Sequence, residues 1–541
     1  MHRRMAAFVR RIAPATVGSR LIHGNSWLLE QELGLSPAAS GERPAGDDAR
    51  VGRDWFASAK RALLAPFGVG TVDQALLGVV AAKHFFVRRY ALAGKVVILD
   101  EVHSYDIYTG TLIDKLIRVL EDLGCTVIVL SATLTGKRRN QIVCSGDKEN
   151  SEANLPYPLI TGRKANEAFP PVPAAPPPPR DVGVAFQTSD DAAQQAVAVA
   201  EKGGCVLWIC NTVASAQEQY RRFLAVVGER FPLGLLHSRF PFWRREELEN
   251  EWMERLGKSG ATRCGSLLVS TQIVEQSVDL DADLLVTELA PTDMLLQRTG
   301  RLWRHERQRP APPSPHLIIL EESASLDDFR RMNAKAIVKT LGGKACVYVP
   351  YVLLRSLEVW KAHTRIELPT QIRCLIESTY KDLASEPDSW QTLFGEWFGI
   401  DSSKKMFAAR NSNIWTVALE DDEGVQTRLN ELPTLPLVLC HRLSETDAEF
   451  LDASRADFRS EEFHLPTAQA IHRNLVRLPA RHFLSAKEHP GIARYLRGPQ
   501  SIGLLDTDGT VEAEGLDTGV RLRWSRDLGI VIDNTFAQEE P

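Results

Sequence analysis

The sequence predicts an α/β protein whose parallel strands are covered by helices on both faces. Short runs rich in valine, isoleucine and leucine, such as residues 95–100 and 266–271, alternate with stretches of helical length. Strands that alternate with helices are typical of parallel sheets. No repeat of fixed period occurs along the chain, which argues against a solenoid or a propeller.

The predicted elements follow one another in two groups. In the first group, strands at residues 95–100 and 125–133 flank a helix at about 108–123. The second group contains amphipathic helices at 212–227 and 242–256. Its strands are expected at residues 205–210, 233–237, 266–271 and 283–289. The helices have apolar residues at the three- and four-residue spacing of one buried face.

The N-terminal twelve residues are rich in arginine but lack the apolar segment of a secretory signal. Their arginine content is similar to that of an organelle transit peptide. Met5, Phe8, Val9 and Ile12 fall on one face of a helix, so we expect an ordinary helix that faces a core.

Length and proline content predict the domain organisation. A chain of 541 residues corresponds to three or four domains at about 150 residues each. Proline-rich stretches at 170–179 and 310–315 cannot join a helix or a central strand, because proline lacks an amide donor. They divide the chain into a first segment at 1–169, a second at 180–309 and a C-terminal domain at 316–541. The C-terminal domain is expected to be mixed and mainly helical.

Composition excludes several classes of protein. Hydrophobic residues at 44% and charged residues at 25% exclude wholesale disorder and fibrous repeats. The net charge of −5 excludes a globally basic protein, although residues 297–309 hold five arginines and one glutamate. No apolar run is long enough for a transmembrane helix. The eight cysteines form no CxxC pair, and those at Cys205 and Cys210 have apolar neighbours, which favours reduced thiols in a cytoplasmic protein.

Two adjacent carboxylates, Asp100 and Glu101, follow the predicted strand at 95–100. Ligands bind at the carboxyl ends of strands in open α/β sheets. An aspartate there can hold Mg²⁺ against triphosphate oxygens, and a neighbouring glutamate can deprotonate an attacking water. The alternative is a solvated turn beside a helix N-terminus that attracts acidic residues.

Polar motifs recur in order at later strand and helix ends. They are Ser-Ala-Thr at 131–133, His-Ser-Arg-Phe at 237–240, STQIVEQSVDLDAD at 270–283 and QRTGRLWRH at 297–305. Together with DEVH at 100–103, this ordered set resembles the later motifs of superfamily 2 helicases. The longer forms, including ALLAPFGVGTVDQALL at 62–77 and LAPTDMLLQRTGRLWRH at 289–305, resemble the helicase-nuclease of type I CRISPR systems. The resemblance covers roughly residues 15–309 and implies tandem RecA-like parallel sheets, the first one incomplete, plus the C-terminal domain.

The resemblance implies roles for residues of the first segment. Asp100 matches the residue that places Mg²⁺ through ATP, and Glu101 matches the residue that activates water. His103 matches the residue that binds at the nucleotide site and couples the nucleotide state to the other lobe. Ser131 and Thr133 match the motif that couples hydrolysis to nucleic-acid movement.

In the second segment, Gln297, Arg301 and Arg304 match the motif that contacts the nucleotide. Arg301 and Arg304 are the arginine-finger candidates, because a guanidinium offsets charge on the transferred phosphoryl group. A phosphate clamp on DNA or a surface salt bridge is the alternative for each. Gln276 and Asp279 are expected to face the nucleotide as well.

A further set of residues is expected to contact nucleic acid. The segment GVGTVDQ at 68–74 matches one that touches the tracked strand, although a plain tight turn is the alternative reading of its glycines. The candidates are Thr71, Asp73, Gln74, His237, Arg239 and Thr271.

Two features that the family implies do not occur in the sequence. A P-loop, GxxxxGK[ST], is absent, and the one GKS at 257–259 has Trp252 where the first glycine would stand. No His-Asp dipeptide of the family's nuclease domain occurs either. The sequence is therefore expected to be an N-terminally truncated, nuclease-less portion of the family, which needs a separate N-terminal nuclease or P-loop polypeptide.

The leading functional prediction is an ATP-dependent translocase or helicase part that uses ATP and Mg²⁺ and reels single-stranded DNA. Its implied partner is the CRISPR RNA-guided surveillance complex in a prokaryotic cytoplasm, with no membrane. Because the P-loop is missing, we expect the chain to be inactive alone. The alternatives are a non-catalytic remnant that binds nucleic acid or partners, and a DExH RNA helicase.

Overall fold

A computed structural model describes residues 19–22, 63–81, 85–102, 107–144, 157–164, 167–260, 262–275, 279–381, 386–412, 433–459, 464–487, 489–493, 495–496 and 499–534. The chain divides into two compact units. Unit 1 combines Met1–Ser151, Thr161–Pro171 and Gly395–Asn430, and unit 2 combines Glu152–Ile160, Val172–Phe394 and Glu431–Pro541. The predicted helix around residues 5–12 lies outside the described residues.

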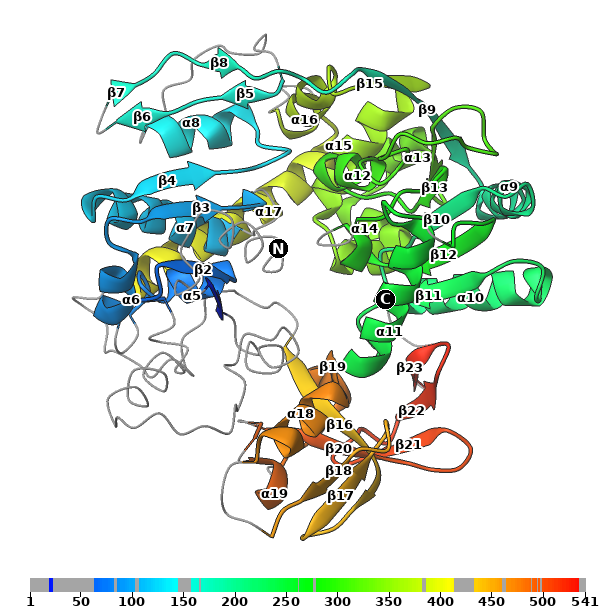
Figure 1. Ribbon diagram of the computed structural model, residues 1–541. Helices are drawn as coiled ribbons and strands as arrows, with labels where there is room; N and C mark the ends of the chain where they lie inside the picture. The colour runs from blue at the N-terminus through cyan, green and yellow to red at the C-terminus, as the bar shows by residue number, and fades with distance from the viewer. Residues whose placement is uncertain are drawn as a thin grey trace. The chain divides into compact units, whose positions relative to one another are not determined.

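Unit 1 contains short parallel strand pairs and a long helix (Figure 1). Strand β3 pairs with β4 in parallel, with Val96 opposite Thr126 and Leu99 opposite Val129. The elements of this unit are β1 (Ser19–Ile22), β2 (Phe67–Gly70), α5 (Val72–Leu76), α6 (Phe85–Leu92), β3 (Val96–Leu99), α7 (Ile107–Asp122), β4 (Thr126–Val129), α8 (Gly136–Cys144), β6 (Arg163–Lys164), β7 (Glu167–Ala168) and the part of α17 (Asp388–Asn411) from residue 395.

Helix α7 packs its apolar face on the β3–β4 pair. Leu112, Leu116 and Leu120 recur every four residues, and all three are buried in one core with Leu99. The chain leaves the helix through Gly124, whose φ of +71° suits glycine at the exit of a helix. The crossover from β3 through α7 to β4 therefore forms as predicted.

The other face of the β3–β4 pair is open. Val96, Ile98, Ile128 and Leu130 are between 40% and 63% exposed. Because strand residues alternate between faces, these four share one surface, opposite to the face that packs on α7. Among the described residues, the sheets of unit 1 have two strands each.

Helix α17 carries a late segment of the chain into unit 1. Ala408 is buried in the core of α7, and the Asn411 side chain donates to the Tyr108 hydroxyl at 3.1 Å. The Tyr108 ring also lies 5.9 Å from that of Phe407. The residues from 395 therefore pack with the first segment, although the proline-rich stretches place them in the C-terminal domain.

Unit 2 is centred on a seven-stranded sheet in the order β11-β12-β10-β13-β14-β9-β15 (Figure 1). The pairs are parallel except that β15 is antiparallel to β9. All five residues of β10 and of β12 are buried, as expected when both faces of a parallel sheet are covered. Gly234 in β11 leaves room for Trp252 of α11, because an added Cβ would lie 2.2 Å from the indole.

The elements of this part of unit 2 agree with the predicted strands and helices, and β14 and β15 extend the sheet beyond residue 309. They are β5 (Leu159–Ile160), β8 (Val172–Pro173), β9 (Arg180–Gln187), α9 (Ser189–Glu201), β10 (Cys205–Ile209), α10 (Val213–Val227), β11 (Leu233–Leu236), α11 (Phe242–Leu256), β12 (Ser266–Ser270), η2 (Gln272–Val274), β13 (Leu284–Thr287), α12 (Thr292–Thr299), β14 (His316–Leu320), α13 (Leu326–Arg331), α14 (Ala334–Leu341), η3 (Gly342–Cys346), α15 (Pro350–Lys361), β15 (Arg365–Leu368) and α16 (Ile372–Tyr380).

The strands between residues 434 and 534 form a second, mostly antiparallel sheet in unit 2, in the order β18-β17-β16-β20-β21-β22-β23, with β19 beside β16. The region from 316 is therefore mixed, with helices concentrated before residue 412 and strands after 433. These later elements are β16 (Thr434–Leu443), β17 (Asp447–Phe450), β18 (Arg455–Asp457), α18 (Leu465–Arg473), β19 (Leu475–Pro479), η4 (Ala480–His482), α19 (Pro490–Ala493), β20 (Ser501–Leu505), β21 (Thr510–Ala513), β22 (Val520–Ser525) and β23 (Gly529–Asn534).

The turn between β22 and β23 packs against the end of β11. The Ile530 amide donates to the Arg239 carbonyl at 3.0 Å, and the Gln217 side chain donates to the Leu528 carbonyl at 2.7 Å. Gly529 has φ +66° and approaches so closely that an added Cβ would lie 2.8 Å from the Arg239 carbonyl. The C-terminal sheet is thus anchored to the parallel sheet within unit 2.

Within the described ranges, no single helix has the length and apolar composition to cross a membrane. One bent pair, Ala334–Cys346 with Pro350–Lys361, satisfies both requirements together. Cys205 and Cys210 are buried free thiols, as their apolar neighbours predict.

Candidate functional site

The two predicted catalytic carboxylates follow β3 directly. Asp100 and Glu101 are both exposed, and the Glu101 amide donates to the Asp100 carboxylate at 3.0 Å. Glu101 has φ +56°, a left-handed conformation that is uncommon outside glycine and concentrates at functional sites. His103 lies outside the described residues.

The Ser-Ala-Thr segment lies at the same sheet edge as the carboxylates. The Leu130 amide donates to the Leu99 carbonyl at 2.8 Å, and the Val102 amide donates back to the Leu130 carbonyl. These bonds bring the residues after β3 beside Ser131, which follows β4. Thr133 is buried, and its hydroxyl has no hydrogen-bond partner among the described residues.

Thr71, Asp73 and Gln74 lie where β2 passes into α5. Thr71 is exposed at the N-cap position, and the other two are in the first turn of the helix. These three are therefore at the carboxyl end of a parallel strand, as β3 and β4 place the other motifs of unit 1.

In unit 2 a buried arginine, Arg298, joins three strand ends. Its guanidinium donates to Glu275 at 2.7 Å, to the Thr287 hydroxyl at 2.6 Å and to the Asn211 side chain at 3.0 Å. It also donates to the Tyr348 hydroxyl at 3.0 Å. Since Asn211 follows β10, Glu275 follows β12 and Thr287 ends β13, one side chain fixes the carboxyl edge of the sheet.

The pair formed by Arg298 and Glu275 is almost fully buried, at 0% and 4% side-chain exposure. Burial raises the pKa of Glu275, while the charge and hydrogen bond of Arg298 oppose that rise. Burial by itself lowers the pKa of Arg298, but Glu275, Tyr348 and Glu288 together outweigh burial, so the net pKa is raised. We regard the arginine as charged and the carboxylate as held ionised by it.

The other predicted nucleotide-contacting residues lie just before β13, in α12 and just after α12. Arg304 forms an ion pair with Asp279 at 2.6 Å, and His305 lies 3.3 Å from the same carboxylate oxygen. Arg301 donates to the Glu275 carbonyl, so its side chain is held toward the segment after β12. The Gln297 amide nitrogen is buried without a hydrogen-bond partner in the described part of the chain. Gln276 lies outside that part.

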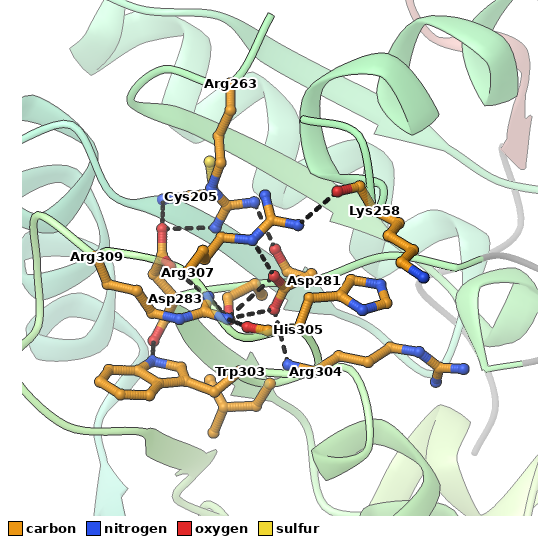
Figure 2. A network of polar contacts seen from close by, with 12 residues as sticks. Cys205, Lys258, Arg263, Asp281, Asp283, Trp303, Arg304, His305, Arg307 and Arg309 are labelled. Carbon is orange, nitrogen blue, oxygen red and sulfur yellow. Dashed lines mark hydrogen bonds and ion pairs between the residues drawn. The ribbon is translucent and has the colours of Figure 1, made fainter. Parts of the chain in front are cut away.

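A second polar network, which we call the carboxylate clasp, lies next to these residues (Figure 2). It consists of Asp281, Asp283, Arg263, Arg307 and Arg309. Both carboxylates have 0% side-chain exposure, and the Arg309 side chain has 3%. The clasp joins the residues before β13 to the residues after α12.

His237, Arg239 and Thr271 occupy the ends of β11 and β12. One ring nitrogen of His237 contacts the Leu528 carbonyl at 3.1 Å, and the other accepts the Arg239 amide at 3.1 Å. Burial lowers the pKa of His237 to about 3, so the ring is neutral at physiological pH. In this conformation the ring, like the buried Thr271, does not present a free polar edge to solvent.

Arg239 itself is half-buried. Burial, followed by repulsion from Arg481, lowers the pKa of its guanidinium to about 10. It remains the one of these three candidates whose charge is available at the surface of the described chain.

Sequence reasoning missed the hub at Arg298 and its partners Glu275, Asn211 and Tyr348. Arg298 lies between two predicted site residues in QRTGR, which is a signal that could have found it. Tyr348 is 50 residues away and falls in no motif, so no local pattern identifies it.

The chemistry of the donors is compatible with Mg²⁺ brought by a nucleotide. The described residues contain no group of three or more histidine, cysteine or acidic side chains that could hold a metal by themselves. Magnesium on a nucleoside triphosphate takes only one or two protein carboxylates, with phosphate oxygens and waters as the other ligands. The exposed Asp100 carboxylate at a strand end meets that requirement.

Comparisons with known proteins show which family the chain is similar to. Residues 202–307 match the C-terminal family of the CRISPR-associated nuclease/helicase Cas3. The CRISPR-associated endonuclease/helicase Cas3 of Thermus thermophilus is 34% identical over 440 residues, which cover 72% of this chain and 45% of the relative. The Escherichia coli Cas3 is 30% identical over 482 residues, which cover 82% and 51%.

A solved structure of T. fusca Cas3 with ATP is similar with a TM-score of 0.78 and 25% identity, over 98% of this chain and 63% of that one. The chain spans about half the length of the curated relatives it matches. Sequence, fold and motif order agree, and the chain therefore belongs to the CRISPR-associated Cas3 helicase family.

Proposed function

We propose that the chain is the motor part of an ATP-dependent translocase that acts on single-stranded DNA in type I CRISPR interference. The observation that carries the proposal is that Arg304 forms an ion pair with Asp279, while Arg301 donates to the backbone of Glu275, the ion-pair partner of the buried Arg298. A guanidinium that is held near a carboxylate can exchange that partner for a phosphate, which is also anionic. The sharing of Asp279 by two basic side chains supports such an exchange for Arg304.

In this proposal the carboxylates of unit 1 carry the hydrolytic chemistry. ATP would supply the phosphoryl group, and Asp100 would hold the Mg²⁺ ion that ATP brings. Glu101 orients and deprotonates the attacking water, and its exposure leaves the carboxylate accessible to solvent. Ser131 and Thr133, at the same edge, couple hydrolysis to DNA movement. His103 senses the nucleotide.

The missing P-loop sets the expected activity of the chain alone. Removing one well-placed charge stabiliser costs about 10²- to 10³-fold in rate, and the P-loop supplies a lysine, a hydroxyl and several amides together. We therefore propose that measurable turnover requires a P-loop-bearing polypeptide. The exposed apolar face of Val96, Ile98, Ile128 and Leu130 supports a partner that covers it, since such a patch marks an interaction site.

We further propose that the DNA is gripped by Thr71, Asp73, Gln74 and Arg239, with His237 and Thr271 fixing the local backbone. The CRISPR RNA-guided surveillance complex would deliver that DNA in the cytoplasm. Grip through phosphates predicts that binding weakens steeply with salt.

ATP turnover tests the proposal. The chain is assayed with single-stranded DNA, with and without a P-loop-bearing polypeptide, as the unmodified protein and as Glu101→Gln and Arg304→Ala. Arg365→Ala serves as control, because Arg365 forms an exposed ion pair with Asp181. We expect turnover only in the complemented sample, with a loss of at least about 100-fold in both site variants and none in the control. Equal turnover in Glu101→Gln would refute the assignment.

A non-catalytic binding module is the second candidate, and the absence of GxxxxGK[ST] from the sequence favours it. Binding of a fluorescent ATP analogue distinguishes the two. An ATP-using motor part should bind the analogue when complemented and lose binding in Asp100→Ala, whereas a binding module should retain DNA affinity and show no nucleotide binding at all.

A further inference from the structure

Residues 301–304 are held by their main chain, and this separates them from ordinary surface loops. The Arg301 carbonyl accepts from the Ala282 amide at 2.8 Å, and the Trp303 amide donates to the Ala282 carbonyl at 2.9 Å. Arg180 donates to the carbonyls of Leu302 and Trp303. None of these bonds involves the side chain of Arg301 or Arg304.

The carboxylate clasp completes this hold on the backbone. Asp281 accepts a hydrogen bond from the Arg304 amide at 2.8 Å and forms an ion pair with the Arg307 guanidinium at 2.8 Å. Arg309 reaches both oxygens of Asp281, at 2.9 and 3.0 Å, and one oxygen of Asp283, at 2.6 Å. Figure 2 shows the two carboxylates enclosed by these guanidiniums.

Asp283 extends the clasp to the start of β10. Its second oxygen accepts the Cys205 amide at 2.7 Å and lies 2.8 Å from the Arg263 guanidinium. The clasp therefore ties the arginine-bearing loop to the sheet rather than to solvent-exposed neighbours. Buried carboxylates that are paired on several sides resist displacement, because removing one partner leaves an uncompensated charge.

Trp303 has an unfavourable backbone conformation, which these contacts stabilise. Its φ of +49° is in the left-handed region, which is an outlier for a bulky side chain. Its indole donates to the Asp283 carbonyl at 3.0 Å, and the Arg309 guanidinium lies 4.9 Å from the ring centre. The conformation turns the chain sharply between Arg301 and Arg304.

We propose that Asp281 and Arg309 are positioning residues for the arginine pair. Through the clasp they fix the backbone of residues 301–304, and with it the direction in which the Arg301 and Arg304 side chains leave the chain. The inference rests on the proposed function in one respect only, which is the role of Arg301 and Arg304 at the nucleotide.

The positioning role of Arg309 depends on its planar guanidinium, whose terminal nitrogens donate in fixed directions. A lysine keeps the charge but is a point donor on a flexible stem, so it cannot reproduce the two nitrogens that bond Asp281 and Asp283 in fixed directions. If only charge neutralisation matters, Arg309→Lys should behave like the unmodified protein. If the fork positions the loop, the lysine variant should fold and still loosen residues 301–304.

Amide hydrogen exchange in the full-length chain tests the inference. We expect Arg309→Lys to exchange roughly tenfold faster at the amides of 301–304, as for a lost buried hydrogen bond, with β12 unchanged. The matched control is Arg365→Lys at the exposed Asp181 pair. Unchanged rates at 301–304, or equal acceleration in β12, would overturn the inference. Should Arg309→Lys fail to fold, Asp281→Asn keeps the size of the side chain and removes its charge, and unchanged rates at 301–304 in that variant would equally overturn the inference.

Turnover with the P-loop-bearing polypeptide separates this inference from the proposed function. We expect Arg309→Lys to lower kcat by about tenfold or more at unchanged KM for ATP, because orientation rather than binding is lost. If the unmodified chain turns over ATP and the loosened variant keeps full kcat, the positioning role fails and the proposed function stands. If the unmodified chain shows no turnover, the proposed function fails, and the exchange data still decide whether the clasp fixes the loop.

Discussion

Replacing Arg298 by methionine should be among the most destabilising single substitutions in unit 2. The change deletes five hydrogen bonds to Glu275, Thr287, Glu288, Asn211 and Tyr348. Methionine fills much of the volume but donates nothing. Glu275, with 4% side-chain exposure, is left without its cation.

The expected loss in the free energy of unfolding is about 3–5 kcal/mol, the usual cost of removing one partner of a buried ion pair. The loss should shrink at lower pH. Burial raises the pKa of Glu275, and without Arg298 only the weaker attraction of Arg301 opposes that rise. A carboxyl whose folded pKa exceeds its unfolded value takes up a proton on folding, so Arg298→Met should be relatively more stable at pH 5 than at pH 8.

Urea unfolding of Arg298→Met, Glu275→Gln and the double variant at both pH values measures these changes in the free energy of unfolding. Because the uncompensated charge is the main cost, the double variant should be more stable than Arg298→Met by about 1–2 kcal/mol. The control Arg365→Met should cost no more than about 1 kcal/mol, as for an exposed pair. A loss below about 1 kcal/mol for Arg298→Met, or no recovery in the double variant, would refute the assignment of Arg298 as the hub of the sheet edge.

Three more substitutions probe other contacts of unit 2. His237 is buried with a pKa of about 3, below its unfolded value, so unit 2 should lose stability as pH falls from about 6.5 toward 3, and His237→Asn should flatten that profile in thermal unfolding. Gly529→Ala should cost about 1–3 kcal/mol in urea unfolding, because φ is +66° and the new Cβ would meet backbone at 2.8 Å; a neutral effect would contradict the anchoring of the β22–β23 turn. Asp279→Asn should free Arg304 and tighten pyrophosphate binding measured by calorimetry, whereas Asp279→Asn with Arg304→Ala should not; equal affinities in both would argue against the exchange of partners.

The α/β class and the order of the motifs along the strands follow from the amino-acid sequence alone. Valine and isoleucine runs form buried parallel strands in this chain, and a polar residue that follows such a run lies at the carboxyl edge of the sheet. Local sequence is therefore sufficient to place Asp100, Ser131 and Thr271 at sheet edges. Their roles in hydrolysis and DNA binding remain predictions.

The partners of these side chains, in contrast, come from tertiary packing. The pairing of Arg298 with Tyr348, the packing of α17 on Tyr108 and the burial of His237 under the β22–β23 turn join residues that are 50 to 303 positions apart. Such contacts depend on how whole elements pack, and local periodicity carries no information about them. The same reason explains why the proline-rich stretch at 310–315 does not end the sheet: β14 completes its backbone hydrogen bonds between β13 and β9, and burial of that strand outweighs the break in local pattern.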